Sequence, residues 1–281
     1  MPEPSSDPRT KSATAVIFDM AAAFHMLKPN NIAATFGQFA PVHLIPFLKA
    51  HLTNKTTRLD GVWDNMYKKV GSIKTQTHQK RGATEGRKTR ITADTPVPQG
   101  KKYEKFLADN NNKDELFKFL SAELIEKINM PSCNVLTTQR EYVLSTQELD
   151  IDFLQPCDHE EADTRVFLHL KHAVLQGHKV VFIPTVDTDL VVLAIITVFD
   201  SLKELGFSEL YIRYGVGKQR RDIPIQDICS QFGPRECQAL RHVSCKLRVR
   251  FFLFQERHRK DDCVVCMESY ARNDRCLHRS N

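Results

Sequence analysis

Apolar and polar positions along the chain follow two periods, and these periods predict strands and helices in turn. Short apolar runs typical of buried strands occur at 14–20, 58–67, 179–186 and 209–215. Apolar residues recur with helical spacing in 32–52, 112–128, 160–177 and 190–199. Strands and helices that alternate in this order predict an α/β fold, with a mainly parallel sheet and helices on both faces.

Composition divides the chain into one central domain and two polar ends. Residues 1–13 are polar and Pro-rich, which predicts a disordered tail and not a signal peptide. The α/β pattern covers 14–230, and 68–102 interrupts it with a stretch rich in Lys and Arg that predicts an exposed basic loop or mobile helix. From 231 to 281 the pattern weakens into an irregular basic tail that contains cysteines.

The overall composition excludes several classes of protein. A chain of 281 residues with 41% hydrophobic residues can bury a substantial core. No apolar run approaches the roughly 20 residues of a membrane span, so no membrane partner is expected. The eight cysteines are scattered except for the last three, unlike a secreted disulfide framework. We expect an intracellular protein, nuclear or cytoplasmic, whose net charge of +6 mildly favours acidic partners.

Acidic side chains stand at the predicted strand ends and helix starts. They are Asp19 and Asp64 after the first two strands, Glu160, Glu161 and Asp163 at the start of the 160–177 helix, and Asp187 and Asp189 after the next strand. Because the carboxyl ends of parallel strands share one edge of a sheet, acids from four segments can meet there. Clustered carboxylates repel one another unless a cation lies among them, and Mg²⁺ or Mn²⁺ prefer oxygen ligands.

A purely structural role for these acids competes with metal binding. Asp and Glu at helix starts cap the helix and interact favourably with its dipole. For Glu160 or Glu161 alone, capping is the better interpretation, and Asp187 can cap the helix that begins at Leu190. For Asp19 the two interpretations weigh equally. The metal hypothesis therefore depends on the four segments together.

The order of these motifs resembles the PIN-like superfamily, in its flap-endonuclease-like branch. The matching motifs are VIFD (16–19), VWD (62–64), EEADTR (160–165) and VDTD (186–189), and the resemblance covers roughly 14–215. Two further stretches, SIKTQTHQKRG and NKDELFKFL, resemble uncharacterised animal proteins of this type.

This resemblance implies a divalent-metal-dependent nuclease with a PIN-like fold. The residues in the family's ligand positions are Asp19, Asp64, Glu161, Asp163, Asp187 and Asp189, while Glu160 stands one residue early but can share the role. They would hold one or two Mg²⁺ or Mn²⁺ ions, which stabilise the attacking and leaving oxygens at a phosphodiester.

The basic stretch suggests nucleic acid as the partner. In flap-endonuclease-like proteins a mobile basic segment follows the second acid and holds the substrate strand. The residues in that place here are Lys74, Lys80, Arg81, Arg87, Lys88 and Arg90. Lys and Arg attract phosphates, and their binding releases counterions. The alternative interpretation is a solvated run of charges, and the scarcity of aromatic residues argues against base stacking.

One departure from the family leaves a non-catalytic function open. The relatives carry another acid in a later loop, but the corresponding region here, RHVSCKLRVRFF (241–252), holds no Asp. A scaffold or nucleic-acid-binding protein that has lost catalysis is therefore the second hypothesis.

The last cysteines form a possible zinc site. The zinc-ligand types there are Cys263, Cys266, Cys276 and His278, in a stretch that resembles the truncated start of a RING-type domain. One Cys₃His zinc site, a truncated fragment and a disordered tail are all consistent with this spacing. A ubiquitin-pathway adaptor is the third hypothesis.

Overall fold

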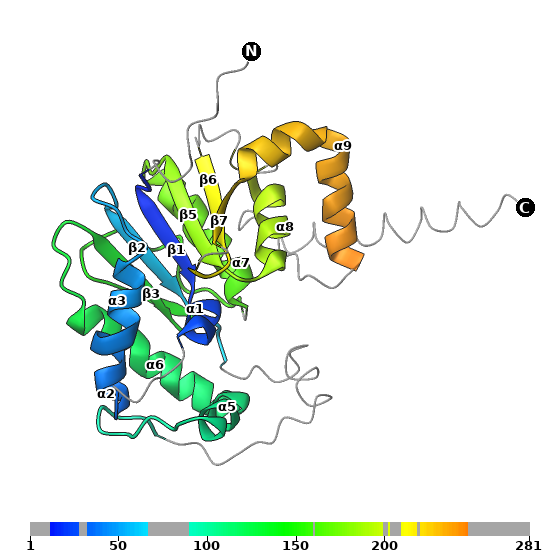
Figure 1. Cartoon of the computed structure of the whole chain (residues 1–281). Coiled ribbons are helices and arrows are strands. Elements are labelled where there is room, and N and C mark those ends of the chain that lie inside the picture. Colours follow the sequence, from blue (N-terminus) through cyan, green and yellow to red (C-terminus); the bar gives the residue numbers. More distant parts are fainter. Residues whose placement is uncertain are drawn as a thin grey trace, which may run out of the picture. The chain divides into compact units, whose positions relative to one another are not determined.

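A seven-stranded sheet forms the centre of the fold (Figure 1). The computed structural model describes residues 12–27, 33–66, 90–159, 161–198, 202, 209–217 and 220–246, all within one compact unit. The strands are β1 (Ala15–Asp19), β2 (Arg58–Val62), β3 (Asn134–Gln139), β4 (Tyr142–Ser145), β5 (Val180–Thr185), β6 (Glu209–Tyr214) and β7 (Arg221–Pro224). Their spatial order is β4-β3-β2-β1-β5-β6-β7. The five central strands are parallel and the two edge strands antiparallel, which confirms the predicted mainly parallel sheet.

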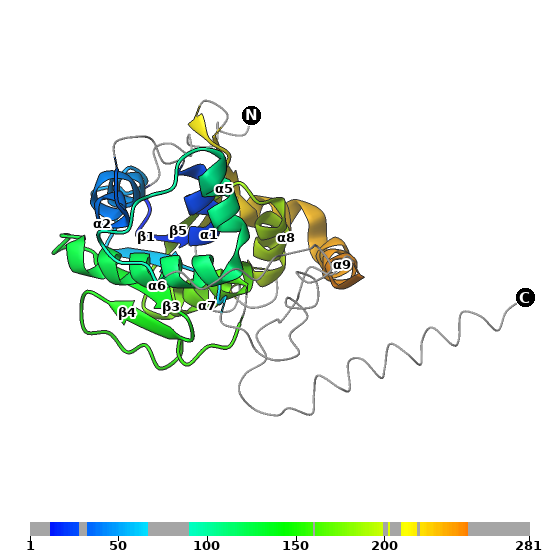
Figure 2. The same cartoon turned by 90° about the horizontal axis from the view of Figure 1, so that it is seen from below.

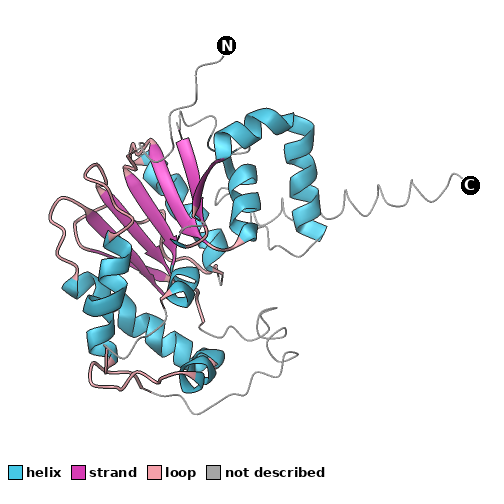
Figure 3. Cartoon of the chain, viewed as in Figure 1, coloured by secondary structure: helices cyan, strands magenta, loops and turns pink. Residues whose placement is uncertain are grey.

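Helices cover both faces of this sheet (Figure 2, Figure 3). They are α1 (Met20–Met26), α2 (Phe36–Phe39), the π-helical turn η2 (Ala40–Leu44), α3 (Ile45–Lys49), α5 (Lys101–Ala108), α6 (Asn110–Lys127), α7 (Ala162–Leu175), α8 (Thr188–Thr197) and α9 (Ile225–Lys246). Among the described residues, no helix combines the length and apolar character that crossing a membrane requires.

Alternation along β1 shows how the two faces are filled. Val16 and Phe18 belong to the main hydrophobic core, together with apolar residues of α1, α2, α3 and α6. Successive strand residues point to opposite faces, so Ile17 faces the other way. Its partner in the β1–β2 register is Asp60, which contacts α7. The predicted helix at 112–128 matches α6, and its expected contacts Leu116, Leu120 and Leu124 are fully buried.

Some boundaries differ from the sequence prediction. Ala13, placed in the predicted disordered tail, is buried under the first strand. The boundary expected at 230 falls inside α9, which continues to Lys246 after an interruption at Gly233, where φ is +75°. A backbone φ in this range favours glycine because it lacks a Cβ. The sequence pattern predicted none of β3, β4 and β7: β4 and β7 have four residues each and form the sheet edges, whereas β3 has six and lies next to β4.

Candidate metal site at the carboxyl edge of the sheet

The strand order reverses between β1 and β5. From β1 the chain moves to β2 and β3 on one side, and from β5 it moves to β6 and β7 on the other. Ligands of open α/β sheets bind outside the carboxyl ends of the strands at such a reversal. Asp19 is the last residue of β1 and Asp187 follows β5 by two positions, so both predicted acids flank this point.

Asp19 and Asp187 are both helix caps. Asp19 Oδ1 accepts hydrogen bonds from the backbone N–H groups of Ala21 (2.9 Å) and Ala22 (3.1 Å) at the start of α1. Asp187 Oδ1 accepts one from the N–H of Asp189 (2.8 Å) at the start of α8. The capping interpretation is thus confirmed for these two acids. Because each cap uses Oδ1, it is compatible with metal binding through the second carboxylate oxygen.

Asp64 is fixed through its neighbour Trp63. The Trp63 backbone N–H donates to Thr138 Oγ1 (2.8 Å), and its indole N–H donates to Thr137 Oγ1 (3.1 Å) on β3. The Asp64 carboxylate in turn accepts a hydrogen bond from the backbone N–H of Ala162 (2.8 Å). This bond holds the loop after β2 against the first turn of α7.

The start of α7 presents two of the predicted acids to this loop. Glu161 occupies the cap position but makes no side-chain capping hydrogen bond, so the capping interpretation fails there. Asp163 Oδ1 accepts a bond from the N–H of Thr164 (2.7 Å). Glu160 lies outside the described residues.

Electrostatics connects the acids of all four segments. Burial, followed by the charges of Asp64 and Asp163, raises the pKa of Asp19 to about 7. Burial, followed by the charges of Glu161, Asp64 and Asp187, raises the pKa of Asp163 to about 7. Carboxylates influence one another in this way only when they lie close together in a poorly hydrated place.

We use the name acidic cluster for the six described acids that meet at this edge. They are Asp19, Asp64, Glu161, Asp163, Asp187 and Asp189. Asp19 is buried and the next three are half-buried, whereas Asp187 and Asp189 are exposed despite the apolar sequence around them. Burial and the charge of Asp187 still raise the pKa of Asp189.

The donors of the acidic cluster fit a hard divalent cation. All are carboxylate oxygens, which Mg²⁺ and Mn²⁺ prefer, and the raised pKa values of Asp19 and Asp163 reflect burial and the charges of neighbouring acids. Among the described residues, no group of three or more His, Cys, Asp or Glu side chains has an arrangement that could hold a metal ion. Metal binding at the cluster therefore stays a prediction.

The other predicted site residues lie outside the part of the chain that the structure describes. These are the basic residues Lys74, Lys80, Arg81, Arg87 and Lys88, and the zinc-ligand set Cys263, Cys266, Cys276 and His278. Arg90, the last of the basic series, is described and exposed.

A buried polar network behind the cluster was not predicted. Arg58 and Asp60 of β2 form a bidentate ion pair, with Nε–Oδ1 at 2.8 Å and Nη2–Oδ2 at 2.7 Å. His169 Nδ1–H donates to Asp60 Oδ2 (2.7 Å), and His172 Nδ1 accepts from Arg58 Nη1 (2.9 Å). His172 Nε2–H donates to the carbonyl of Asp150 (2.9 Å). The network joins β2 to α7, which carries Asp163.

The sequence contains a signal for this network. In RLDGV, Arg58 and Asp60 are two positions apart and therefore share one face of the strand. When a basic and an acidic residue share one face of a buried strand, each charge needs a partner of opposite sign. The simplest arrangement is that the two residues pair with each other. Both histidines of the network, His169 and His172, are buried.

Comparison with known proteins adds no family to this description. No protein-family model, no curated protein and no solved structure matches the chain. The class of protein that the coordinates define is an α/β protein with an acidic cluster at the carboxyl edge of its sheet. The resemblance to the PIN-like superfamily stays a prediction.

Replacing Asp187 should separate its capping role from its charge. We expect Asp187→Ala to lower the free energy of unfolding by about 1 kcal/mol, because the first turn of α8 loses its acceptor. Asp187→Ser should retain most of that stability, since serine is an equally good cap. Urea unfolding of the two variants in EDTA measures the difference. Equal stability of both variants would show that the cap contributes nothing.

Proposed function

We propose that this protein is a PIN-like nuclease that depends on a divalent metal and hydrolyses phosphodiester bonds of nucleic acid. The observation that carries the proposal is the acidic cluster, in which two carboxyl groups have pKa values of about 7 because they are buried and other acids lie near them. Caps or surface charges alone do not require acids from four separate segments at one sheet edge.

The protein's own contribution is to hold the carboxylates in place. Asp19, Asp64, Asp163 and Asp187 would hold the ion or ions, with Glu161 and Asp189 beside them. A bound divalent ion supplies a Lewis acid for the phosphate and lowers the pKa of a water nucleophile. Helix caps fix two of these side chains, and the bond from Ala162 fixes a third, so little reorganisation is needed on metal binding.

Nucleic acid is the proposed substrate because of charge. The chain carries a net charge of +6, and its basic side chains are concentrated directly after Asp64 in the sequence. We propose that Lys74, Arg81 and Arg87, assisted by Lys80 and Lys88, contact phosphates of the strand. Such contacts make the affinity fall steeply with salt.

Calorimetric titration of Mn²⁺ into the protein tests the proposal. We expect the wild type to bind Mn²⁺, and the double variant Asp187→Ser/Asp189→Ala to bind it at least about tenfold more weakly. Serine at 187 retains the cap of α8, so the loss would report on the carboxylates and not on the helix. Cleavage of a labelled oligonucleotide in Mn²⁺ should fall in parallel. Equal binding by both proteins would place the metal elsewhere.

A catalytically impaired scaffold is the second candidate. The observation in its favour is the composition of α9, which within its described part holds no Asp after Asp227. This candidate predicts nucleic-acid binding that survives in EDTA and no cleavage in Mn²⁺. The same two assays therefore separate the candidates.

A further inference from the structure

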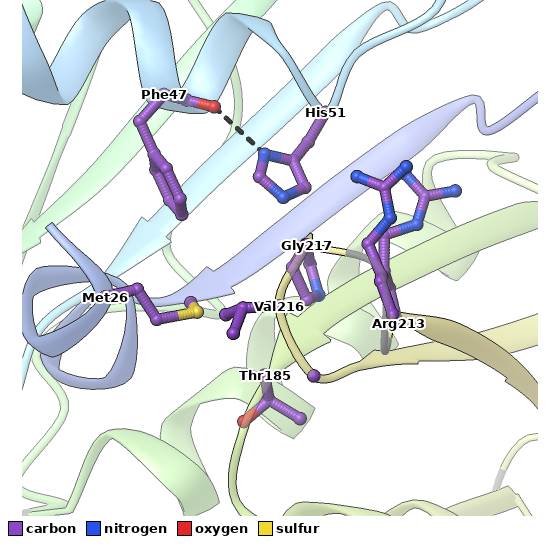
Figure 4. Close-up of a pocket in the computed structure, with 10 residues that line it drawn as sticks. Met26, Phe47, His51, Thr185, Arg213, Val216 and Gly217 are labelled. Atoms are coloured by element: carbon purple, nitrogen blue, oxygen red, sulfur yellow. Dashed lines mark hydrogen bonds between the residues drawn. The ribbon is translucent and has the colours of Figure 1, made fainter.

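A pocket of about 240 Å³ lies on the α1–α3 side of the sheet, at the ends of β5 and β6 (Figure 4). Its walls come from α1, α3, the ends of β5 and β6, and the loop that leads to β7. Phe47 and the exposed Val216 supply apolar surface. The volume is below the roughly 300–1,000 Å³ of sites for drug-sized ligands, so it suits a small group or one nucleotide unit.

The titratable side chains of this pocket are all basic. Arg213, Arg220 and His51 line it, and none of its described lining residues is acidic. In Figure 4 the guanidinium of Arg213 and the imidazole of His51 lie toward one end and Thr185 toward the other. Arg220 is exposed at the rim.

Arg213 is held rigidly. Its Nε donates to Asp222 Oδ1 (2.9 Å) and its Nη2 to Asp222 Oδ2 (3.0 Å), while the guanidinium carbon lies 4.4 Å from the Phe182 ring centroid. One carboxylate thus balances one of two guanidinium groups, and the pocket keeps a positive charge. A preorganised guanidinium loses little entropy when it binds an anion.

His51 is oriented by a hydrogen bond to the helix that precedes it. Its Nδ1–H donates to the carbonyl of Phe47 (2.9 Å), which leaves Nε2 for a ligand. Burial lowers the pKa of His51, and the charges of Arg213 and Arg220 lower it further. An anion bound among His51, Arg213 and Arg220 would raise the pKa of His51.

The pocket and the acidic cluster share one turn of the chain. Thr185, the last residue of β5, lines the pocket, and its Oγ1 accepts a hydrogen bond from the N–H of Asp187 (3.0 Å). The Thr185 carbonyl accepts a bond from Gly215 (3.0 Å), which also lines the pocket. The pocket wall is therefore hydrogen-bonded to the backbone of Asp187, one of the acids that would hold the metal.

We infer that this pocket is an anion subsite that binds a phosphate group of the nucleic acid whose backbone reaches the acidic cluster. Arg213 and Arg220 supply the donors for the phosphate oxygens, and His51 adds a third through Nε2–H when its ring is protonated, because its Nδ1–H is already donated to Phe47. The apolar wall contacts the sugar or base. The source of the phosphate rests on the proposed function, whereas the anion specificity rests on the pocket alone.

Binding of dithymidine monophosphate (TpT) in EDTA tests this inference. The comparison ligand is the same dinucleotide with an uncharged methylphosphonate linkage. We expect TpT to bind about tenfold more tightly, which is the effect of one charge-assisted hydrogen bond. Binding is followed through the ¹H–¹⁵N resonances of the His51 imidazole, assigned with His51→Gln.

Two arginine variants make the test specific. Arg220→Gln should abolish the preference for the charged linkage. Arg221→Gln is the matched control, because Arg221 is also exposed but lies over the Tyr214 ring (5.6 Å) and does not line the pocket. The control should keep the wild-type preference.

The outcomes separate the inference from the proposed function. The inference would be overturned if the wild type bound the two dinucleotides equally well. It would also be overturned if Arg220→Gln and Arg221→Gln lost the preference for the charged linkage to the same extent. Inorganic phosphate that binds as tightly as TpT would overturn the nucleic-acid part and leave a site for free phosphate. The experiment contains no metal and measures no cleavage. A protein without nuclease activity can therefore still show the preference for TpT, and an active nuclease can lack it.

Discussion

Asp60→Asn is expected to lower the free energy of unfolding by about 3–5 kcal/mol, the largest effect of any single substitution proposed for this protein. The variant leaves the guanidinium of Arg58, which is 2% exposed, buried without its counter-charge. His169 also loses the charge on its acceptor. Urea unfolding at neutral pH measures the loss.

A double variant provides the control for this prediction. Arg58→Met/Asp60→Leu removes both charges, and replacing a buried ion pair by apolar residues is often close to neutral. We therefore expect the double variant to be more stable than Asp60→Asn alone. A loss below about 1 kcal/mol for Asp60→Asn, the value of an exposed pair, would contradict the prediction.

The pH dependence of this effect has a definite sign. Burial alone raises the pKa of Asp60, but Arg58 and then His169 outweigh it, so the pKa lies well below its ordinary value of 3.8. The stabilisation is therefore complete above the pKa of the unfolded chain and is lost as the pH falls below about 4. The stability difference between wild type and Asp60→Asn should shrink in that range.

Asp163→Asn should have opposite effects on activity and on stability. Removing one carboxylate from the acidic cluster should reduce Mn²⁺-dependent cleavage by at least about 100-fold, since even outer-shell changes at metal sites cost 10–100-fold. The same change should stabilise the metal-free protein at pH 8 by about 2 kcal/mol, because it removes an ionised carboxylate from among like charges. Cleavage assays and urea unfolding in EDTA measure the two effects.

The sign follows from the raised pKa. Between the ordinary value of 3.8 and about 7, the folded protein retains a proton on Asp163 that the unfolded chain has released. The free energy of unfolding of the metal-free protein therefore decreases as the pH rises through this range. In Asp163→Asn this decrease should be smaller. Asp152→Asn, at an exposed acid outside the cluster, is the control and should change neither property. Loss of both activity and stability in Asp163→Asn would instead assign the residue a purely structural role.

Much of the acidic cluster could be predicted from the sequence because its members follow local rules. Asp19, Asp64 and Asp187 each end or follow an apolar strand, and parallel strands end at one edge. The burial that raises the pKa of Asp19 could not be predicted, because it depends on which elements pack over the end of β1. Neither could the exposure of Asp189 within an apolar stretch.

The anion pocket had no comparable local signal. His51 follows α3, Arg213 belongs to β6, and Thr185 ends β5, so the three lie in distant parts of the sequence. Each residue is ordinary in its own segment. Only the pairing of β5 with both β1 and β6 brings them together.

The sequence by itself determined four of the seven strands, the main helices, the α/β class and the positions of the acids along the chain. Strand and helix periods are local properties of the backbone, and each can be read in a window of a few residues. Tertiary structure alone decided the strand order, the pairing of Arg58 and Asp60 with α7, and the pocket at the ends of β5 and β6. These depend on contacts between distant segments, and such contacts are selected by packing of the whole core and not by any local pattern.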